Sequence, residues 1–196
     1  LPPAPSPLRL VETTWQDHPV IVVAAHSPLV PRYEIWIEQD RALDAWNTLN
    51  ATGARPCGSS SIEQLRILEG TPAYSIDITN KDLPQETNQM RALHFTKGCY
   101  LGQEIVERIR SRGNVHRHLR HIELDGPLPA AGSELTLDGA PAGHITSAAE
   151  LTLPVGPRRF ALAMIRAEAE ARNLPLNYSV AETNGTAHLL AAPPTF

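Results

Sequence analysis

The feature that most constrains the fold is a change in pattern near residue 114. From there to the C-terminus, short runs with alternating apolar residues are separated by turn-forming pairs such as Gly126-Pro127, Gly132-Ser133 and Asp138-Gly139. Alternation indicates strands with one buried face, and turns at short intervals indicate antiparallel neighbours. Residues 114–196 are therefore predicted to form a small β-barrel or sandwich. The expected strands are 119–124, 135–137, 160–165, 176–180 and 187–190, with a short turn-forming insert at 167–171.

The residues before 114 mix strand and helix patterns. Residues 20–25 are a continuous apolar run and residues 33–38 alternate, so each indicates a strand. Two helices are expected. The first follows Gln39-Asp40, with the apolar residues Ala42, Leu43, Trp46 and Leu49. The second begins near Ser59–Ser61 and carries Ile62, Leu65 and Ile67. The proline-rich lead at 1–7 and the turn-rich segment 71–94 are expected to be irregular. This order predicts an α+β domain over residues 1–113.

The composition excludes several classes of protein. The chain has 196 residues, 42% of them hydrophobic, which suits an ordinary globular core, and its net charge of −4 gives no general affinity for nucleic acid. Cys57 and Cys99 are its two cysteines. This count excludes a disulfide-rich secreted scaffold and a complete four-cysteine iron–sulfur site within one chain. No Cys/His array has the spacing of a metal site. No run of about 18 apolar residues predicts a transmembrane helix.

Cys99 lies in a segment with distinctive local chemistry. Lys97 precedes it by two residues, and a helix is expected directly after it, with Glu104 in the first turn and Gly113 after the last. The expected apolar stripe of this helix is Leu101, Ile105, Val106 and Ile109. A nearby cation and a helix N-terminus both favour a thiolate over a thiol. The segment therefore predicts a functional cysteine, and the alternative is a small buried hydrophobe without chemistry.

The segment 97–104, Lys-Gly-Cys-Tyr-Leu-Gly-Gln-Glu, resembles the K-G-C-Y-x-G-Q-E motif of the YgfZ family. These are folate-binding proteins linked to iron–sulfur cluster assembly and repair, and they are related in fold to the glycine-cleavage T-protein, an aminomethyltransferase. Further segments resemble the family in the same order along the chain. They are 46–49, 53–58, 66–72, 76–78, 83–88, 143–147 and 161–163.

The resemblance implies a fold and a function. The fold would be the C-terminal part of an aminomethyltransferase-like, folate-binding α+β fold that ends in a small Greek-key β-barrel. The chain would be an accessory protein for iron–sulfur cluster assembly or repair, indirectly supporting tRNA modification. Its partners would be tetrahydrofolate and iron–sulfur assembly factors or cluster-containing client enzymes. Neither direct nucleic-acid binding nor a membrane is implied, and the expected location is cytoplasmic.

The resemblance also implies roles for individual residues. Cys99 would be the key thiol, and Lys97 would favour its thiolate. The cofactor-binding candidates are Tyr100, Gln103, Glu104, Arg108 and Glu69. No residue is expected to bind a metal.

Two departures from the family pattern matter. Family members usually carry well over a hundred residues before the matched region, so an N-terminal segment or a second chain is expected to complete the fold. Relatives also often place a glutamate two residues before the glycine of the R-I-x-x-G segment, and in the T-protein that carboxylate holds the pterin. Here Leu68 occupies that place and Glu69 follows it. One step along a strand would turn the carboxylate to the opposite face.

Other interpretations remain open at this point. The chain could be a tetrahydrofolate-dependent aminomethyltransferase of the T-protein type, or a remnant without a ligand site. Residues 108–121 contain five arginines and no acid, which could form an anion site for a folate tail or a phosphate, or a solvated basic face. Arg108 is the best single anion-binding candidate, although a simple Glu104–Arg108 pair on the helix surface fits the spacing equally well.

Overall fold

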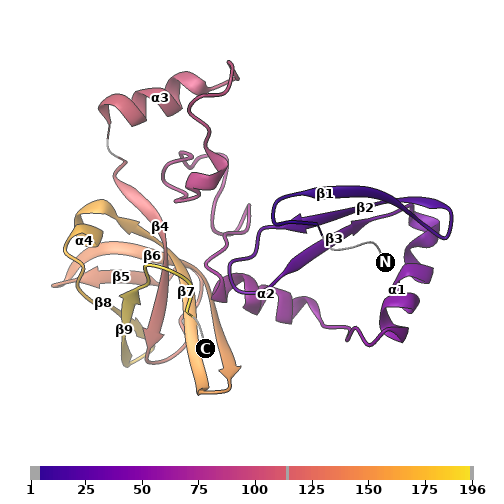
Figure 1. Cartoon of the computed structure of the whole chain (residues 1–196). Coiled ribbons are helices and arrows are strands. Elements are labelled where there is room, and N and C mark those ends of the chain that lie inside the picture. The colour runs from indigo at the N-terminus through magenta and orange to yellow at the C-terminus, as the bar shows by residue number, and fades with distance from the viewer. Residues whose placement is uncertain (1–4, 114, 195–196) are drawn as a thin grey trace. The chain divides into compact units, whose positions relative to one another are not determined.

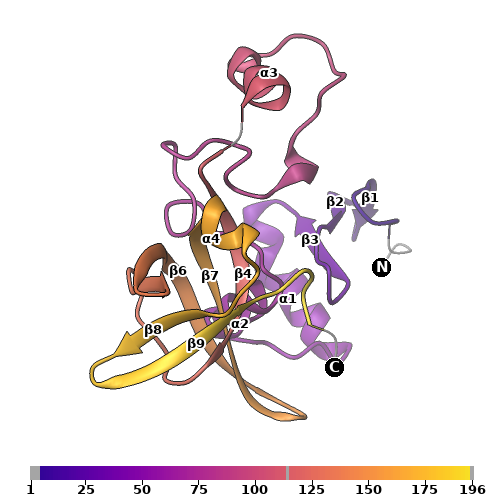
Figure 2. The ribbon, with the colours of Figure 1, turned by 90° about the vertical axis from the view of Figure 1, so that its left-hand side faces the viewer.

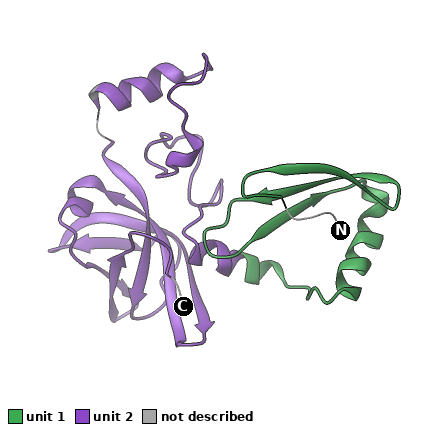
Figure 3. Ribbon diagram, in the orientation of Figure 1, with its two compact units in different colours: residues 1–62 green, residues 63–196 purple. Residues whose placement is uncertain are grey.

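The computed structural model describes residues 5–113 and 115–194. Its contacts divide the chain into two compact units, residues 1–62 and residues 63–196 (Figures 1 and 3). The predicted boundary near residue 114 lies inside the second unit, just before the first barrel strand, and as a domain boundary it stays a prediction. Of the proline-rich lead, residues 1–4 lie outside the described part of the chain.

The first unit contains a three-stranded antiparallel sheet. Its strands β1 (Leu10–Trp15), β2 (His18–Ala25) and β3 (Arg32–Trp36) lie in that order. The two later strands match the predicted ones within a few residues, whereas β1 was not predicted. Its half-buried residues Val11, Thr13 and Trp15 alternate with exposed ones that include the apolar Leu10, so the hydrophobic alternation is a weak signal. Gln16 and Asp17, both with positive φ, form the tight turn to β2.

The helix of the first unit packs against the sheet with a different face from the predicted one. A short 3₁₀ turn, η1 (Gln39–Arg41), leads into α1 (Ala42–Ala51) as expected. Leu43 and Trp46 are exposed, however, so the predicted apolar face is wrong at these positions. The side facing the sheet is formed by Ala45, Thr48 and Leu49, which line an apolar cavity together with residues of β1–β3 and Ile37. These three positions share the i, i+3, i+4 spacing of one helix face.

The second unit begins with helices and loops. Helix α2 (Ser59–Leu68) crosses the boundary between the units and confirms the second predicted helix, with Ile67 and Leu68 buried at its end. Residues 71–94 are irregular as predicted, apart from the 3₁₀ turn η2 (Met90–Ala92) and an isolated bridge between Tyr74 and Ile78. Helix α3 (Gln103–Arg112) then follows the cysteine motif.

A closed six-stranded barrel forms the rest of the second unit (Figure 2). Its strands are β4 (Arg117–Asp125), β5 (Glu134–Leu137), β6 (Ala140–Leu153), β7 (Gly156–Arg166), β8 (Leu176–Val180) and β9 (Thr183–Leu189). Strands β5, β6 and β7 are consecutive neighbours, and β4 returns beside β7. This is the predicted Greek-key arrangement. The core is built from inward side chains of all six strands, among them Ile122, Leu135, Ile145, Ile165, Leu176 and Ala187.

Two details of the barrel follow from local sequence. Asp138 and Gly139 both have positive φ and form the predicted two-residue hairpin turn between β5 and β6. The insert between β7 and β8 is the short helix α4 (Ala167–Ala171). The long strand β6 was predicted only as short β-like runs, because Gly143 and a register shift at Thr146 interrupt its alternation.

Candidate functional site

The cysteine motif lies on the segment leading into α3. Cys99 is exposed with a free thiol, and so is Cys57, which belongs to the first unit. Around Cys99, Lys97 and Gly98 are also exposed, while Tyr100 is half-buried. The alternative of a buried cysteine is therefore wrong for Cys99, whose thiol is open to solvent.

Three predicted site residues come together in this segment. The Lys97 ammonium lies over the Tyr100 ring, with Nζ 4.4 Å from its centroid, a cation–π geometry. The Tyr100 backbone N–H donates to Gln103 Oε1 at 3.1 Å. The backbone N–H groups of Thr96 and Lys97 donate to Nδ1 of His94 at 3.2 and 2.8 Å. Lys97, Tyr100 and Gln103 thus fix the shape of the loop that carries Cys99.

Helix α3 starts further along the chain from Cys99 than the sequence predicts. Its first residue is Gln103 and its N-cap is Gly102, so the thiol lies four residues before the helix. Glu104 lies in the first turn and Gly113 follows the last, as predicted. The predicted apolar stripe is only partly correct: Leu101 is fully exposed and Ile105 is 52% exposed. Val106 is buried, and its carbonyl accepts a hydrogen bond from Gln85 at 3.0 Å, so this residue attaches the helix to the preceding loop.

The arginines of segment 108–121 have diverse partners. Arg110 lies over the Phe95 ring and pairs with Glu107 at 3.4 Å. Arg120 pairs with Glu170 of α4. Arg117 pairs with Asp82 and Glu86 at 2.9 and 3.0 Å, and its hydrogen bond with Glu86 raises the pKa of its guanidinium. These three arginines attach segments to one another and do not form a common anion site.

Arg108 remains available for an anion. Its side chain is exposed, and the described residues offer it no ion-pair partner. The alternative Glu104–Arg108 pair is not formed among the described contacts. Arg108 could therefore still bind an anion, as predicted from the sequence.

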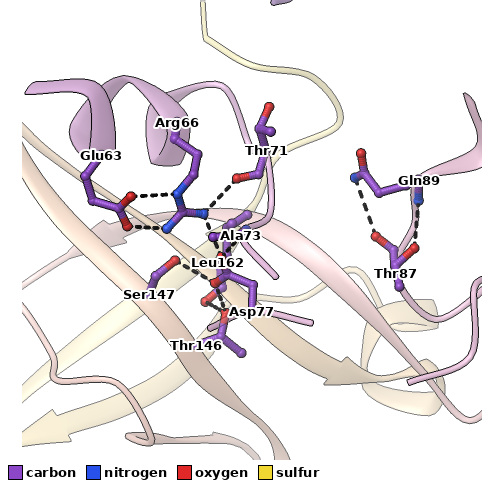
Figure 4. Close-up of polar contacts among 10 residues, drawn as sticks. All are labelled: Glu63, Arg66, Thr71, Ala73, Asp77, Thr87, Gln89, Thr146, Ser147 and Leu162. Atoms are coloured by element: carbon purple, nitrogen blue, oxygen red, sulfur yellow. Dashed lines mark hydrogen bonds and ion pairs between the residues drawn. The ribbon is translucent and has the colours of Figure 1, made fainter. Parts of the chain in front are cut away.

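A buried polar cluster was missed as a site by sequence reasoning (Figure 4). Asp77 has a fully buried side chain, and its Oδ2 accepts hydrogen bonds from Arg66 at 2.6 Å and from the Ala73 N–H at 2.9 Å. Its Oδ1 accepts from the hydroxyls of Thr146 and Ser147 at 2.5 and 2.7 Å. A single carboxylate thus joins helix α2, the loop after it and barrel strand β6.

The bulge in β6 explains how two consecutive residues reach one carboxylate. Neighbouring residues of a regular strand point to opposite faces. Here the register against β7 shifts between Ile145 and Ser147, so Thr146 is the extra residue. A bulge of this kind redirects a side chain, and it brings both hydroxyls onto Asp77.

The electrostatics of this cluster favour its ion pairs. Burial alone would lower the pKa of Arg66, but the hydrogen bonds and charges of Glu63 and Asp77 outweigh it and raise that pKa. The hydrogen bond from Arg66 lowers the pKa of Glu63. Arg66, Asp77 and Thr146-Ser147 belong to three separate segments of the family resemblance. Because all of them lie in segments that resemble the family, the sequence offered a signal for this cluster. Their role is to hold the fold together.

The remaining predicted residue, Glu69, lies directly after α2. It is buried, with 7% exposure, and its backbone N–H continues the helical bonding to Leu65. The expected strand at Leu68 and Glu69 is therefore wrong, because both residues lie at the end of a helix and both are buried. Leu68 offers no carboxylate at the family's pterin position, and the Glu69 side chain faces the interior. The described residues thus fit the pterin end of a folate poorly.

His121 of β4 lies in the same part of the second unit. Its ring packs against Phe160 with centroids 5.8 Å apart, and both ring nitrogens are buried without a hydrogen-bond partner of good geometry. Burial lowers the pKa of His121 to about 4, an effect that the Ile67 backbone only partly opposes. The imidazole is therefore neutral at physiological pH.

A wide concave surface of about 780 Å³ lies where the start of β4 and β6 meets the end of β7. Its polar lining is mixed and contains His116, His144 and Arg166 together with Glu134 and Glu168. Arg117 of the basic segment also lines it, but Cys99 and the predicted folate-binding residues do not. Among the described residues, no group of three or more His, Cys, Asp or Glu side chains could hold a metal ion. None of their helices has the length and apolar character needed to span a bilayer.

Comparison with known proteins finds no matching family model but several relatives. A chloroplast protein of Arabidopsis thaliana, whose name marks it as a candidate transferase, is 35% identical over 106 residues, which are 54% of this chain and 24% of that one. The mitochondrial iron–sulfur cluster assembly factor IBA57 of Mus musculus is 33% identical over 112 residues, 53% of this chain and 29% of the factor. An aminomethyltransferase of Rippkaea orientalis is 27% identical over 165 residues, 82% of this chain and 43% of the enzyme.

The solved structures support the same fold. Glycine cleavage system aminomethyltransferase T from Bartonella henselae matches with a TM-score of 0.69 and 17% identity, covering 89% of this chain and 49% of that one. At this identity the match concerns the fold alone, and it confirms the predicted fold class. The chain spans less than half the length of each of these relatives.

Proposed function

We propose, from the premise that this chain is YgfZ-like and related to the T-protein fold, that it is an accessory protein for iron–sulfur cluster assembly or repair. In this role Cys99 is the key thiol, and the whole protein supports cluster-dependent enzymes, including those that thiolate tRNA. The work would be done in the cytoplasm, together with assembly factors or client enzymes.

One observation carries the proposal: the cysteine of the family motif is exposed on a loop with an ordered shape. Cys99 is open to solvent, and Lys97, Tyr100 and Gln103 hold the loop through the contacts described above. A thiolate in this position can bind iron, or take the outer sulfur of a partner's persulfide while the partner's thiolate leaves. Alternatively it can attack a partner's disulfide and form a mixed disulfide, releasing the other sulfur as a thiolate, because thiolates are both metal ligands and nucleophiles. These two modes remain alternatives.

Tetrahydrofolate is the proposed ligand of the scaffold, although its pterin end lacks a suitable carboxylate in the described residues. Arg108 is exposed and could pair with a carboxylate of the folate tail. Calorimetric titration of the protein with tetrahydrofolate tests the ligand directly, and the Arg108→Gln variant should weaken any binding that uses the tail.

An aminomethyltransferase is the second candidate, favoured by the match that covers 82% of this chain. One-carbon transfer requires a group near the folate nitrogen to direct protons. The family's acid is replaced by Leu68, and Glu69 is buried, so the described residues supply no such group. Turnover with glycine-cleavage H-protein and tetrahydrofolate would support this candidate, and its absence would support the accessory role.

The experiment that tests the accessory role is complementation in a cell deficient in the corresponding YgfZ-family protein. Cys99→Ser in the protein that carries this sequence should fold normally and fail to restore cluster-enzyme activity. Cys57→Ser is the matched control, because Cys57 is equally an exposed free cysteine, and it should restore activity. Full rescue by Cys99→Ser would refute a functional thiol at this position.

A further inference from the structure

The surface beside Cys99 exposes large apolar side chains. Leu101 is fully exposed and Ile105 is 52% exposed, although Val106 on the same helix is buried. Leu101 lies two residues after the thiol, and Ile105 lies in the first turn of α3. Apolar side chains gathered at one place on a surface, rather than scattered singly, indicate an interaction site.

The same stretch carries positive charge. Residues 89–113 contain five basic residues and two acidic ones, a net charge of +3 in a chain whose total is −4. Arg108 follows Ile105 by three residues, so the two side chains are neighbours on the helix surface. Its guanidinium is exposed and has no ion-pair partner among the described residues.

We propose that Leu101, Ile105 and Arg108, which we name the α3 surface, bind an acidic protein that presents an apolar side chain between carboxylates. The charge of the stretch is complementary to such a partner and would steer its approach. An apolar centre with a charged rim is the usual anatomy of a protein interface. Nucleic acid is the weaker match, because its phosphates would leave Leu101 and Ile105 without a partner.

The α3 surface gives the proposed function a means of partner selection. The proposed function supplies only the identity of the partner, a protein that donates or accepts iron or sulfur, and in this respect the inference rests on it. Docking on Leu101 and Ile105 would bring such a protein next to Cys99. The surface itself follows from exposure and charge, so it can be tested without any cluster chemistry.

The test uses synthetic peptides and a fluorophore on Cys99. In a Cys57→Ser background, Cys99 is labelled with an environment-sensitive dye, which reports binding beside it. The probes are a peptide of glutamates around two leucines, the same peptide with lysines for glutamates, and an oligothymidine strand. The acidic peptide should bind best, and its affinity should fall as salt is raised.

Matched variants locate the binding site. Ile105→Asp and Arg108→Glu should each weaken the acidic peptide about tenfold. Ile62→Asp is the control for the first, because Ile62 is 54% exposed on α2, close to the 52% of Ile105. Arg55→Glu, at an exposed arginine of the first unit, is the control for the second. Neither control should change the affinity, and circular dichroism checks that all four variants fold.

The outcomes separate this inference from the proposed function. The inference is overturned if the lysine peptide or the oligothymidine binds as well as the acidic peptide. It is also overturned if no probe binds up to about 1 mM, or if Ile105→Asp and Arg108→Glu behave like their controls. If the acidic peptide does not bind but Cys99→Ser fails in complementation, the α3 surface alone is refuted. If the acidic peptide binds as expected but Cys99→Ser restores activity fully, the thiol alone is refuted.

Discussion

Two motif-bearing regions of the second unit contrast sharply in their physical character. The Asp77 cluster is buried, and one carboxylate accepts four hydrogen bonds, two of them from the Thr146 and Ser147 hydroxyls about 70 residues further along the chain. The Cys99 segment is exposed, and its contacts are to residues within a few positions along the chain. Both belong to the same family resemblance. A shared motif can therefore mark either a part that holds the fold or a part that meets other molecules.

The contrast teaches how to separate the two kinds of motif residue. A buried polar residue keeps its identity because its partners would otherwise be left unpaired. An exposed residue with few internal contacts adds little to stability, so its chemical type must serve something outside the molecule. By this criterion Asp77 is structural, and Cys99 is the residue that the proposed function assigns to reaction or binding.

The largest expected effect comes from removing the Asp77 carboxylate. Asp77→Ala leaves the Arg66 guanidinium, with 13% of its side chain exposed, without its buried partner. Breaking a buried ion pair from one side typically costs about 3–5 kcal/mol of unfolding free energy. Chemical denaturation should show a loss of this size. Asp77→Asn should lose less, because the amide keeps one acceptor oxygen and the hydroxyls of Thr146 and Ser147 can rotate to accept. Equal losses for both variants would contradict this account of the cluster.

The next largest effect is a pH dependence of the unfolding free energy, caused by His121. Its pKa is about 4 in the folded protein and near 6.5 when unfolded. Below pH 6.5 the unfolded chain binds a proton that the folded protein excludes, so stability is complete above this pH and falls as the pH decreases toward 4. The total loss is at most about 3 kcal/mol, of which about 2 kcal/mol appears between pH 7 and pH 5.

The His121→Leu variant isolates this contribution, because leucine packs against Phe160 without titrating. Denaturation midpoints of both proteins are measured at pH 7 and pH 5. The wild type should lose more stability than the variant over this interval, and parallel losses would show that His121 is hydrated in the folded state.

A pair of glycines compares strand β6, which carries Thr146 and Ser147, with the Cys99 segment. A Cβ at Gly143 of β6 would lie 2.2 Å from the Met164 carbonyl oxygen and 2.9 Å from the Ile165 Cα, so the backbone of β7 would have to move. A Cβ at Gly98, beside Cys99, meets nothing within 4 Å. Gly143→Ala should cost about 1–3 kcal/mol, as overpacking usually does. Gly98→Ala should leave the thermal midpoint almost unchanged, and the reverse order would contradict the burial of the two regions.

The sequence predicted the barrel and the helices well because their signals are local. Turn pairs such as Asp138-Gly139 and the alternation of residues 119–124 are readable within a few positions. The Asp77 cluster depends on a β-bulge and on contacts across about 70 residues, and a single sequence shows neither. The orientation of α1 and the exposure of Leu101 failed for a related reason. An apolar residue indicates burial only if another segment is there to cover it.

The smallest expected effect is at Cys99 itself, and its smallness is informative. Cys99 is exposed and its thiol has no partner among the described residues, so Cys99→Ser should change the free energy of unfolding by no more than about 0.5 kcal/mol. Denaturation of the variant and the wild type under reducing conditions measures this difference. A near-zero change combined with failed complementation would show that the sulfur is needed for function and not for folding. A large loss of stability would instead make Cys99 a structural residue like Asp77, and the division between the two regions would then be wrong.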